Sequence, residues 1–495
     1  MTIRRVLIAN RGEIAVRIAR ACREAGIESV AVYSDVDADA LHVSTADHAV
    51  CIGPVRSYLS IPTLIEAAQR LGADTLHPGY GFLSERPELA RACDRAGIVF
   101  IGPPADAIER MGSKIGAREI MTRAGVPIVP GQTPGDQTDE GIRRAAIELA
   151  FPVLLKASAG GGGKGMRIAR HESEVIELAA SARREGEAAF GDGTLYVERL
   201  IERPRHVEIQ IFGDAHGNVI HLFERECSLQ RRHQKIVEES PSPALTPDMR
   251  TRMGDAAVAA ARAVGYRNAG TVEFLVEGAG ASARFYFLEM NTRLQVEHPV
   301  TEAVTGVDLV RAQLAVAAGE PLPWHQHELT QRGHAIECRI YAEDPANGFL
   351  PQAGPLLVYH EPIGPGIRVD SGVRQGDRVG VAYDPLLAKL IVFGETRAAA
   401  TARAIAALRE YPILGIQSNV PFLIRLLLHS AFAAGDLHTG LVDTLVPELT
   451  SREDVPLEVL ATAALAESVD AMQGSESASQ PAQFDPWTTL ERWGR

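Results

Sequence analysis

Cysteine is scarce in this chain, which has five cysteines among 495 residues. Their number is odd and no CxxC pair occurs, which argues against a disulfide framework and against a structural zinc site. A reducing compartment, the cytoplasm, fits this pattern best. The cysteines are Cys22, Cys51, Cys93, Cys227 and Cys338. Neither Cys22 nor Cys338 has a basic residue at a spacing that would indicate a catalytic thiol, so we interpret both as packing residues.

Long apolar runs are lacking too. Stretches such as residues 256–264 and 422–428 fall far short of the ~20 residues that a membrane-spanning helix needs. The N-terminus reaches a strand-like run at residues 6–9 without an apolar signal region, so we expect neither a signal peptide nor a membrane anchor.

An excess of positive charge is also missing, because 50 Lys and Arg face 63 Asp and Glu, for a net charge of −13. Nucleic-acid binding depends on clustered cations, so a general nucleic-acid role is disfavoured. A local cationic pocket for a small anion remains compatible with this total. The length exceeds what one hydrophobic core holds, which predicts two to four domains.

The first third of the chain alternates strand-like and helix-like segments. This alternation predicts a parallel sheet covered by helices on both faces. Ligands of such sheets sit at the carboxyl ends of the strands, where residues 10–13 and 77–85 fall. The predicted strands are residues 6–9, 29–33, 74–76 and 99–101, and an amphipathic helix is predicted at about residues 13–25.

Residues 289–297 are the most informative stretch, because every second side chain is polar or charged. An extended backbone would place Glu289, Asn291, Arg293, Gln295 and Glu297 on one face. An edge strand with a solvated face is the alternative for such a pattern. The preceding segments 271–276 and 284–288 look like paired apolar strands, and each carries one acid. Buried carboxylates need a partner, and oxygen ligands suit Mg²⁺, so a metal site is predicted here.

A second segment, residues 151–169, combines an apolar strand ending at Lys156 with four glycines and Lys164. Glycine backbones can close around phosphate oxygens. Neither the P-loop pattern nor a dinucleotide GxGxxG fingerprint is present. The segment therefore predicts a mobile phosphate-binding lid, with a flexible surface hairpin as the alternative.

With these motifs the chain resembles the biotin carboxylase component of biotin-dependent carboxylases, in the ATP-grasp superfamily. The resemblance runs from about residue 3 to residue 445. The motifs are IANRGEIA from Ile8, HPGYGFLSE from His77, KAS with its glycine lid from Lys156, RHVEIQ from Arg205, ECSLQRRHQK from Glu226, EMNTR from Glu289 and HAIECRI from His334.

The resemblance implies a mixed α/β and α+β architecture in three domains. The first is a Rossmann-like parallel-sheet N-terminal domain at residues 1–113. An ATP-grasp domain with a mobile lid at about 133–203 follows at residues 114–320, with residues 131–135 as a hinge. A C-terminal biotin carboxylase domain occupies residues 333–445. Residues 446–495 are expected to be a tail or linker with a partner-docking segment.

The resemblance also implies a site that holds ATP, Mg²⁺ or Mn²⁺ (two ions), bicarbonate and biotin. Glu297 would be the base that deprotonates bicarbonate, and Arg339 would stabilise the biotin enolate. Tyr80 would border the biotin pocket. The expected metal ligands are Glu273, Glu289 and Asn291, and the expected bicarbonate ligands are Lys235, Arg293, Gln295 and the main chain of Val296. The expected ATP contacts are Lys114, Lys156, Gly162, Gly163, Glu198, Arg199, Leu200, Ile201, His206, Gln230, His233, Glu273, Leu275 and Glu289.

Three local expectations go with this site. Arg199 and Leu200 replace the lysine and aromatic residue that relatives carry in the adenine hinge, which leaves backbone contacts to adenine. Period two places His233 on one face with Arg231 and Lys235. His325 and His327 are interpreted as part of a loop and not as a metal site.

The implied reaction is ATP-dependent carboxylation of biotin by bicarbonate through carboxyphosphate, as the first half-reaction of an acyl-CoA carboxylase. The alternatives are the matching component of a pyruvate or other oxoacid carboxylase, another ATP-grasp carboxylating ligase, and a non-catalytic nucleotide binder. The expected partners are a biotin carboxyl carrier, a second copy of the chain, with Arg20 and Glu24 at the dimer contact, and a carboxyltransferase subunit. No Met-Lys dipeptide occurs, so biotin is expected on a separate carrier, and Trp487 and Trp493 are expected at a partner interface.

Overall fold

The computed structural model describes residues 2–157, 166–451 and 461, except for the side chains of residues 114, 115, 189, 190 and 281. The glycine lid and the tail tryptophans lie outside the described residues. The chain divides into two units, Met1–Leu449 and Thr450–Arg495, and all named elements belong to the first. No helix in the described part of the chain is long and apolar enough to cross a membrane.

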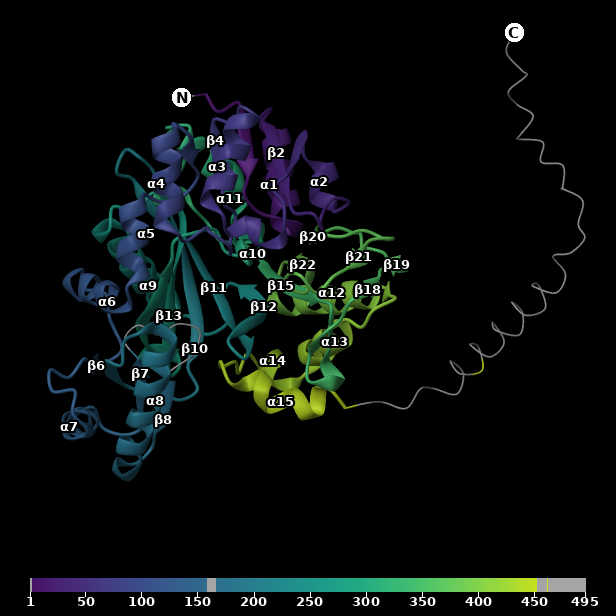
Figure 1. Ribbon diagram of the computed structural model, residues 1–495. Helices are drawn as coiled ribbons and strands as arrows, with labels where there is room; N and C mark the ends of the chain where they lie inside the picture. Colours follow the sequence, from purple (N-terminus) through teal and green to yellow (C-terminus); the bar gives the residue numbers. More distant parts are fainter. Residues whose placement is uncertain (1, 158–165, 452–460, 462–495) are drawn as a thin grey trace, which may run out of the picture. The chain divides into compact units, whose positions relative to one another are not determined.

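The N-terminal segment forms the predicted parallel sheet (Figure 1). Its described strands run in the order β3-β2-β1-β4-β5, and all neighbours pair in parallel. The central strands β1, β2 and β4 are buried on both faces, as expected of a sheet flanked by helices. Bounds are β1 Arg5–Ile8, β2 Glu28–Tyr33, β3 His48–Cys51, β4 Thr75–His77 and β5 Val99–Phe100; α1 Gly12–Glu24, α2 Leu41–Thr45, η1 Val55–Leu59, α3 Ile61–Arg70, α4 Pro87–Ala96 and α5 Ala105–Gly112.

A second sheet carries the strands on either side of the glycine run. Its described order is β6-β9-β7-β8, and every pair is antiparallel. The predicted hinge at residues 131–135 begins as the short edge strand β6. Helices α7 and α8 pack on this sheet around Ile142, Val175 and Leu155. Bounds are α6 Lys114–Arg123, β6 Gly131–Gln132, α7 Asp139–Leu149, β7 Val153–Ala157, β8 Met166–Ala169, η2 Glu172–Glu174, α8 Val175–Phe190 and β9 Leu195–Arg199.

The largest sheet has the described order β14-β13-β10-β11-β12-β15-β22-β20, with antiparallel pairing throughout. The strands predicted at 271–276 and 284–288 are the paired strands β13 and β14. Helix α9 covers one part of this sheet, and α10 packs across β15 through Val300 and Val304. Bounds are β10 Arg205–Gly213, β11 Val219–Arg231, β12 Gln234–Ser240, α9 Pro247–Ala263, β13 Asn268–Glu277, η3 Gly280–Ser282, β14 Arg284–Asn291, α10 His298–Thr305, α11 Leu309–Ala317 and η4 Gln326–Glu328.

The C-terminal segment adds strands β15, β20 and β22 to that sheet and covers them with helices (green and yellow in Figure 1). Helices α12 and α13 pack on β15 and β22 through a core that includes Leu390, Leu408 and Leu423. Bounds are β15 His334–Tyr341, β16 Glu343–Asp344, η5 Pro345–Asn347, β17 Leu350–Pro351, β18 Gly354–Pro355, β19 Val358–Tyr359, β20 Ile367–Ser371, β21 Arg378–Val379, β22 Leu386–Gly394, α12 Arg397–Arg409, β23 Ile413–Leu414, α13 Val420–Leu428, α14 Ser430–Ala434 and α15 Leu441–Leu449.

Candidate functional site

A row of charged side chains crosses the largest sheet. Arg225 pairs across the strands with Glu208, Glu208 with Glu273, and Glu273 with Glu289. Directly opposite residues in a sheet share a face, so these side chains lie on one surface. Arg225 and Glu208 are fully buried, and the Arg225 Nε donates to a Glu208 oxygen at 2.5 Å.

Lys235 on β12 is surrounded by three carboxylates from different elements. Its Nζ lies 2.6 Å from Glu208, 2.9 Å from Glu273 and 2.6 Å from Glu297. Burial alone would lower the pKa of Lys235, but these acids raise it well above its usual value. The ammonium is therefore charged, and it binds all three carboxylates at once.

Arg339 on β15 joins Glu297 from the other side. Its guanidinium donates to Glu238 at 2.6 Å and to Glu297 at 2.9 Å. Burial by itself would raise the pKa of Glu297, but Lys235, Arg339 and Arg225 hold it well below its usual range. Glu297 is therefore an ionised, fully buried carboxylate between two cations.

The run from Glu289 to Glu297 is extended only as far as Asn291, the last residue of β14. The prediction of one continuous strand to residue 297 was wrong, because Val296 and Glu297 form the turn that leads into α10, which has Pro299 in its first turn. The predicted side chains still meet through hydrogen bonds. Arg293 donates to Gln295 at 2.8 Å and to Asn291 at 3.2 Å, and Gln295 donates to Glu273 at 3.2 Å.

The expected metal ligands lie together, with Glu273 in the middle of β13 and Glu289 and Asn291 near the end of β14. Glu273 and Glu289 are directly opposite, and Asn291 donates its amide to Glu273 at 2.8 Å. A cavity of about 260 Å³ is lined by Glu289 and Asn291. Glu273 is buried whereas Glu289 is exposed, so the pair could hold a cation at a solvent-accessible edge. Two carboxylates and an amide oxygen fit Mg²⁺ or Mn²⁺, which leaves room for phosphate oxygens and water.

His206 adds a nitrogen to the same cluster. Its Nε2 lies 2.9 Å from Glu273, and its Nδ1 lies 2.7 Å from the amide of Gln230. Burial alone would lower the pKa of His206, but the Glu273 carboxylate outweighs burial and raises it. The predicted nucleotide contacts His206 and Gln230 therefore lie beside the predicted metal ligand Glu273.

The predicted adenine-hinge residues, 198–201, lie at the end of β9 and just after it. Lys156 on β7 forms an ion pair with Glu198 on β9. The guanidinium of Arg199 binds both oxygens of Glu277 at 2.9 and 2.8 Å, so its charge is already satisfied within the chain. Ile201 and Leu275 lie in a small apolar cluster with Val129 and Tyr286, and the amide of Leu200 donates to Pro152 at 2.9 Å.

Other predicted phosphate contacts are not tested by the described residues. Lys114 is the first residue of α6, and its side chain is not described. Gly162, Gly163 and Lys164 lie outside the described residues.

His233 is not on the face predicted for it. It lies at the tip of the hairpin between β11 and β12, where Arg232 and His233 have φ angles of 49° and 66°. A two-residue turn with positive φ at both positions reverses the chain. Gln230 therefore pairs with Lys235 and Arg231 with Gln234, which puts Arg231 and Lys235 on opposite faces. Arg231 instead binds Glu343 at 3.0 Å.

Two further expectations concern the N-terminal helix and the histidine pair. Arg20 pairs within the chain, with its guanidinium 2.8 Å from Asp370. His325 and His327 stack with ring centroids 5.8 Å apart. His325 precedes the short 3-10 helix η4 and His327 lies within it, so the segment is a single helical turn and not an irregular loop.

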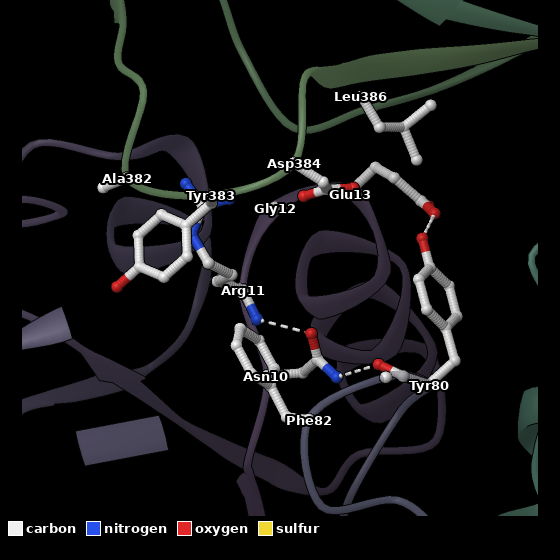
Figure 2. A pocket seen from close by; sticks show the side chains of 11 residues that line it. Asn10, Arg11, Gly12, Glu13, Tyr80, Phe82, Ala382, Tyr383, Asp384 and Leu386 are labelled. Carbon is white, nitrogen blue, oxygen red and sulfur yellow. Dashed lines mark hydrogen bonds between the residues drawn. The ribbon is translucent and has the colours of Figure 1, made fainter. Parts of the chain in front are cut away.

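Tyr80 lines a cavity of about 460 Å³ between the N-terminal segment and the loop before β22 (Figure 2). Arg11 lies over the ring of Tyr383 at 4.0 Å and binds Asp37 with two hydrogen bonds of 2.9 Å. The phenol of Tyr80 donates to the carboxylate of Glu13, which lies beside it in the cavity wall. The cavity combines aromatic walls with carboxylates.

Sequence reasoning missed several residues of the cluster. Glu208 could have been found, because it alternates with His206 on one strand. Arg225 belongs to β11, and only the sheet register brings it beside Glu208. Glu238 lies on β12 three residues after Lys235, a spacing that period two assigns to the opposite face, so its place beside Arg339 was not predicted. Glu85, 3.0 Å from the Nε of Arg293, comes from the distant loop after β4.

Comparison with known proteins shows the family. Three family models match the chain in order: "Biotin carboxylase, N-terminal domain" at residues 2–108, "Carbamoyl-phosphate synthase L chain, ATP binding domain" at 113–325 and "Biotin carboxylase C-terminal domain" at 337–444. The chain belongs to the biotin carboxylase family of ATP-grasp enzymes.

Among its relatives, the biotin carboxylase of Halalkalibacterium halodurans is 51% identical over 452 residues, which is 91% of this chain and 99% of that protein. The mitochondrial alpha subunit of methylcrotonoyl-CoA carboxylase from Glycine max is 52% identical over 450 residues, or 90% of this chain. This chain spans only 61% of the length of that relative.

Solved structures agree in fold. The biotin carboxylase domain dimer of 2-oxoglutarate carboxylase from Hydrogenobacter thermophilus, in complex with MgADP, ADP and bicarbonate, has a TM-score of 0.86 and 45% identity. It matches 92% of this chain and all of that one. Biotin carboxylase from Campylobacter jejuni, in a β-γ-ATP complex, has a TM-score of 0.85 and 44% identity over 90% of this chain and 99% of that one.

Proposed function

We propose that the chain catalyses the ATP-dependent carboxylation of biotin by bicarbonate, with biotin presented on a separate carrier. The observation that carries the proposal is Glu297, a fully buried carboxylate held between Lys235 and Arg339 beside the acids Glu273 and Glu289. A base, an anion-binding cation and oxygen ligands for a metal thus lie within one cluster.

Phosphoryl transfer to bicarbonate depends mainly on positioning and charge neutralisation. Glu273, Glu289 and Asn291 would hold the metal ions, which neutralise charge on the phosphates when bound. Lys235, Arg293 and Gln295 and the main chain of Val296 would bind bicarbonate, because a forked guanidinium matches the plane of a carbonate with parallel hydrogen bonds. Nucleotide contacts are assigned to the hinge and lid residues named from the sequence.

The same cluster supports the proposed roles of a base and of a biotin-binding residue. Glu297 would take the proton of bicarbonate, so that carboxyphosphate can form. Arg339 would then stabilise the biotin enolate after its ureido proton leaves, as a preorganised cation at a developing charge. Glu13 and Asp384 line the cavity beside Tyr80, and we assign this cavity to biotin and its carrier.

For the final carboxyl acceptor and the partners we propose only a class. An acyl-CoA acceptor is favoured, with the carboxyltransferase on a separate chain. An oxoacid acceptor is the alternative, since a pyruvate carboxylase subunit of Methanothermobacter thermautotrophicus is 51% identical over 89% of both chains. We also propose a homodimer, the domain limits 1–113, 114–320, 333–445 and 446–495, docking through residues 484–495, and a cytoplasmic location.

The test is ATP hydrolysis by the purified chain. The proposal predicts slow hydrolysis that requires both Mg²⁺ and bicarbonate and that rises when free biotin is added. Hydrolysis of ATP at the same rate with and without bicarbonate would contradict it.

A further inference from the structure

Lys389 on β22 is a buried cation that the proposed mechanism does not use. Its side chain is 0% exposed. Its Nζ donates to the carbonyl oxygen of Val296 at 2.8 Å and lies 3.3 Å from Glu13 and 3.9 Å from Asp370. A buried ammonium is costly unless it is paired, so its place in the structure is strongly constrained.

The carbonyl that Lys389 holds belongs to the peptide linking Val296 to Glu297. A peptide unit is planar, so fixing its oxygen also fixes the amide and the Cα of the next residue. The position of the Glu297 carboxylate between Lys235 and Arg339 therefore depends in part on Lys389. Lys389 itself reaches no atom of the proposed bicarbonate site other than this backbone oxygen among the contacts described.

Lys389 is also connected to the cavity of Figure 2, through Glu13. One oxygen of Glu13 faces Lys389, and the other accepts the phenol proton of Tyr80. Both Glu13 and Tyr80 line the cavity of about 460 Å³, whereas Val296 lies before α10. Hydrogen bonds and one ion pair thus form a continuous chain, Tyr80–Glu13–Lys389–Val296, that links four separate segments of the protein.

We propose that Lys389 is a positioning residue that couples the Tyr80 cavity to the bicarbonate site through Glu13 and the Val296 carbonyl. A group that enters the cavity and meets Tyr80 changes the hydrogen bond to Glu13. Because Glu13 also pairs with Lys389, the change shifts Lys389 and, with it, the Val296 carbonyl that positions Glu297. This inference rests on the proposed function, because it assigns bicarbonate to the site beside Glu297.

The test is the KM for bicarbonate in ATP hydrolysis without biotin, so that no ligand occupies the cavity. Tyr80→Phe removes one hydroxyl and keeps the ring, and Lys389→Met keeps the length of the side chain without its charge. Each should raise the KM for bicarbonate by about fivefold or more, the usual lower range for coupled sites, with little change in the KM for ATP.

The two substitutions should also be non-additive. In the Lys389→Met background, Tyr80→Phe should add less than about twofold, because the link through which it acts is already broken. If Lys389→Met does not fold, Glu13→Gln takes its place in the cycle. Tyr411→Phe is the matched control: it removes a buried hydroxyl that bonds Tyr359 at 2.6 Å, away from the cavity, and should leave the KM for bicarbonate unchanged.

Two results would overturn the coupling: an unchanged KM for bicarbonate in Tyr80→Phe, or additive effects of Tyr80→Phe and its partner substitution. A wild-type protein without any bicarbonate-dependent hydrolysis would instead overturn the proposed function. The two failures are therefore distinguishable in the same assay.

Discussion

Glu297→Gln isolates the role of the base, because glutamine keeps the shape of the side chain and removes its charge. Glu297 is 0% exposed and lies 2.6 Å from the Nζ of Lys235 and 2.9 Å from Arg339. Since these cations hold its pKa well below the usual range, Glu297 is ionised at neutral pH and can accept a proton. Such a low pKa also makes it a weak base, so positioning must supply much of its effect.

The expected loss of activity is large and the expected loss of stability is moderate. Removing a general base typically lowers turnover by about 10²- to 10⁴-fold. Breaking a buried ion pair costs about 3–5 kcal/mol when it leaves a charge uncompensated. Here Lys235 keeps Glu208 and Glu273, and Arg339 keeps Glu238, so the stability cost should fall below that range and the variant should fold.

The assay is steady-state ATP hydrolysis with bicarbonate and free biotin, combined with calorimetric titration of MgATP and thermal unfolding. Glu239→Gln is the matched control, because Glu239 is a buried carboxylate on the same strand as Lys235 that pairs with His334 and Arg397 outside the site. It should lose stability and keep its turnover. The reasoning would be refuted if Glu297→Gln retained turnover within about tenfold of wild type, or if it lost MgATP affinity in proportion to rate.

Three further predictions address metal binding, pH and the hinge. Glu289→Gln should weaken MgATP binding by at least about tenfold as well as slowing turnover, the scale of losing metal contacts; unchanged affinity in titrations would contradict its assignment as a ligand. Burial lowers the pKa of His42 from 6.5 to about 4, so the unfolded state binds a proton at a higher pH than the folded state does. The free energy of unfolding should therefore fall as the pH drops from about 6.5 to about 4. In urea titrations, His42→Gln should make this fall smaller. Arg199→Gln should change the ATP Kd by no more than about fivefold, because a partly exposed ion pair contributes at most about 1 kcal/mol; a larger change would show that the Arg199 side chain contacts the nucleotide.

Much of the fold could be predicted from periodicity. The strands at residues 29–33 and 271–276 appear within one to three residues of their predicted limits, because long apolar alternation is a strong local signal. The parallel sheet followed from the regular alternation of strands and helices.

Local sequence patterns gave wrong predictions where tertiary contacts or turns determine the backbone conformation. The turn at Arg232 and His233 uses positive φ at two residues other than glycine, so no glycine marks it in the sequence. Without that turn, period two places Arg231 on the face of Lys235, whereas its partner is Glu343, 112 residues away.

The motif residues of the candidate site could be predicted from the sequence, whereas the residues that pair with them and hold them in place could not. Lys235, Arg293 and Glu297 were found because they are close in sequence or belong to long motifs. Glu238 and Lys389 were missed, because the register of β12, β15 and β22 brings them to the site and no single segment contains the pattern.

The most direct test of the central claim is transfer of isotopically labelled bicarbonate to free biotin. The chain should form acid-labile labelled carboxybiotin only when ATP and Mg²⁺ are both present, in an amount that matches the biotin-stimulated release of phosphate. ATP consumption with no label on biotin would contradict the account.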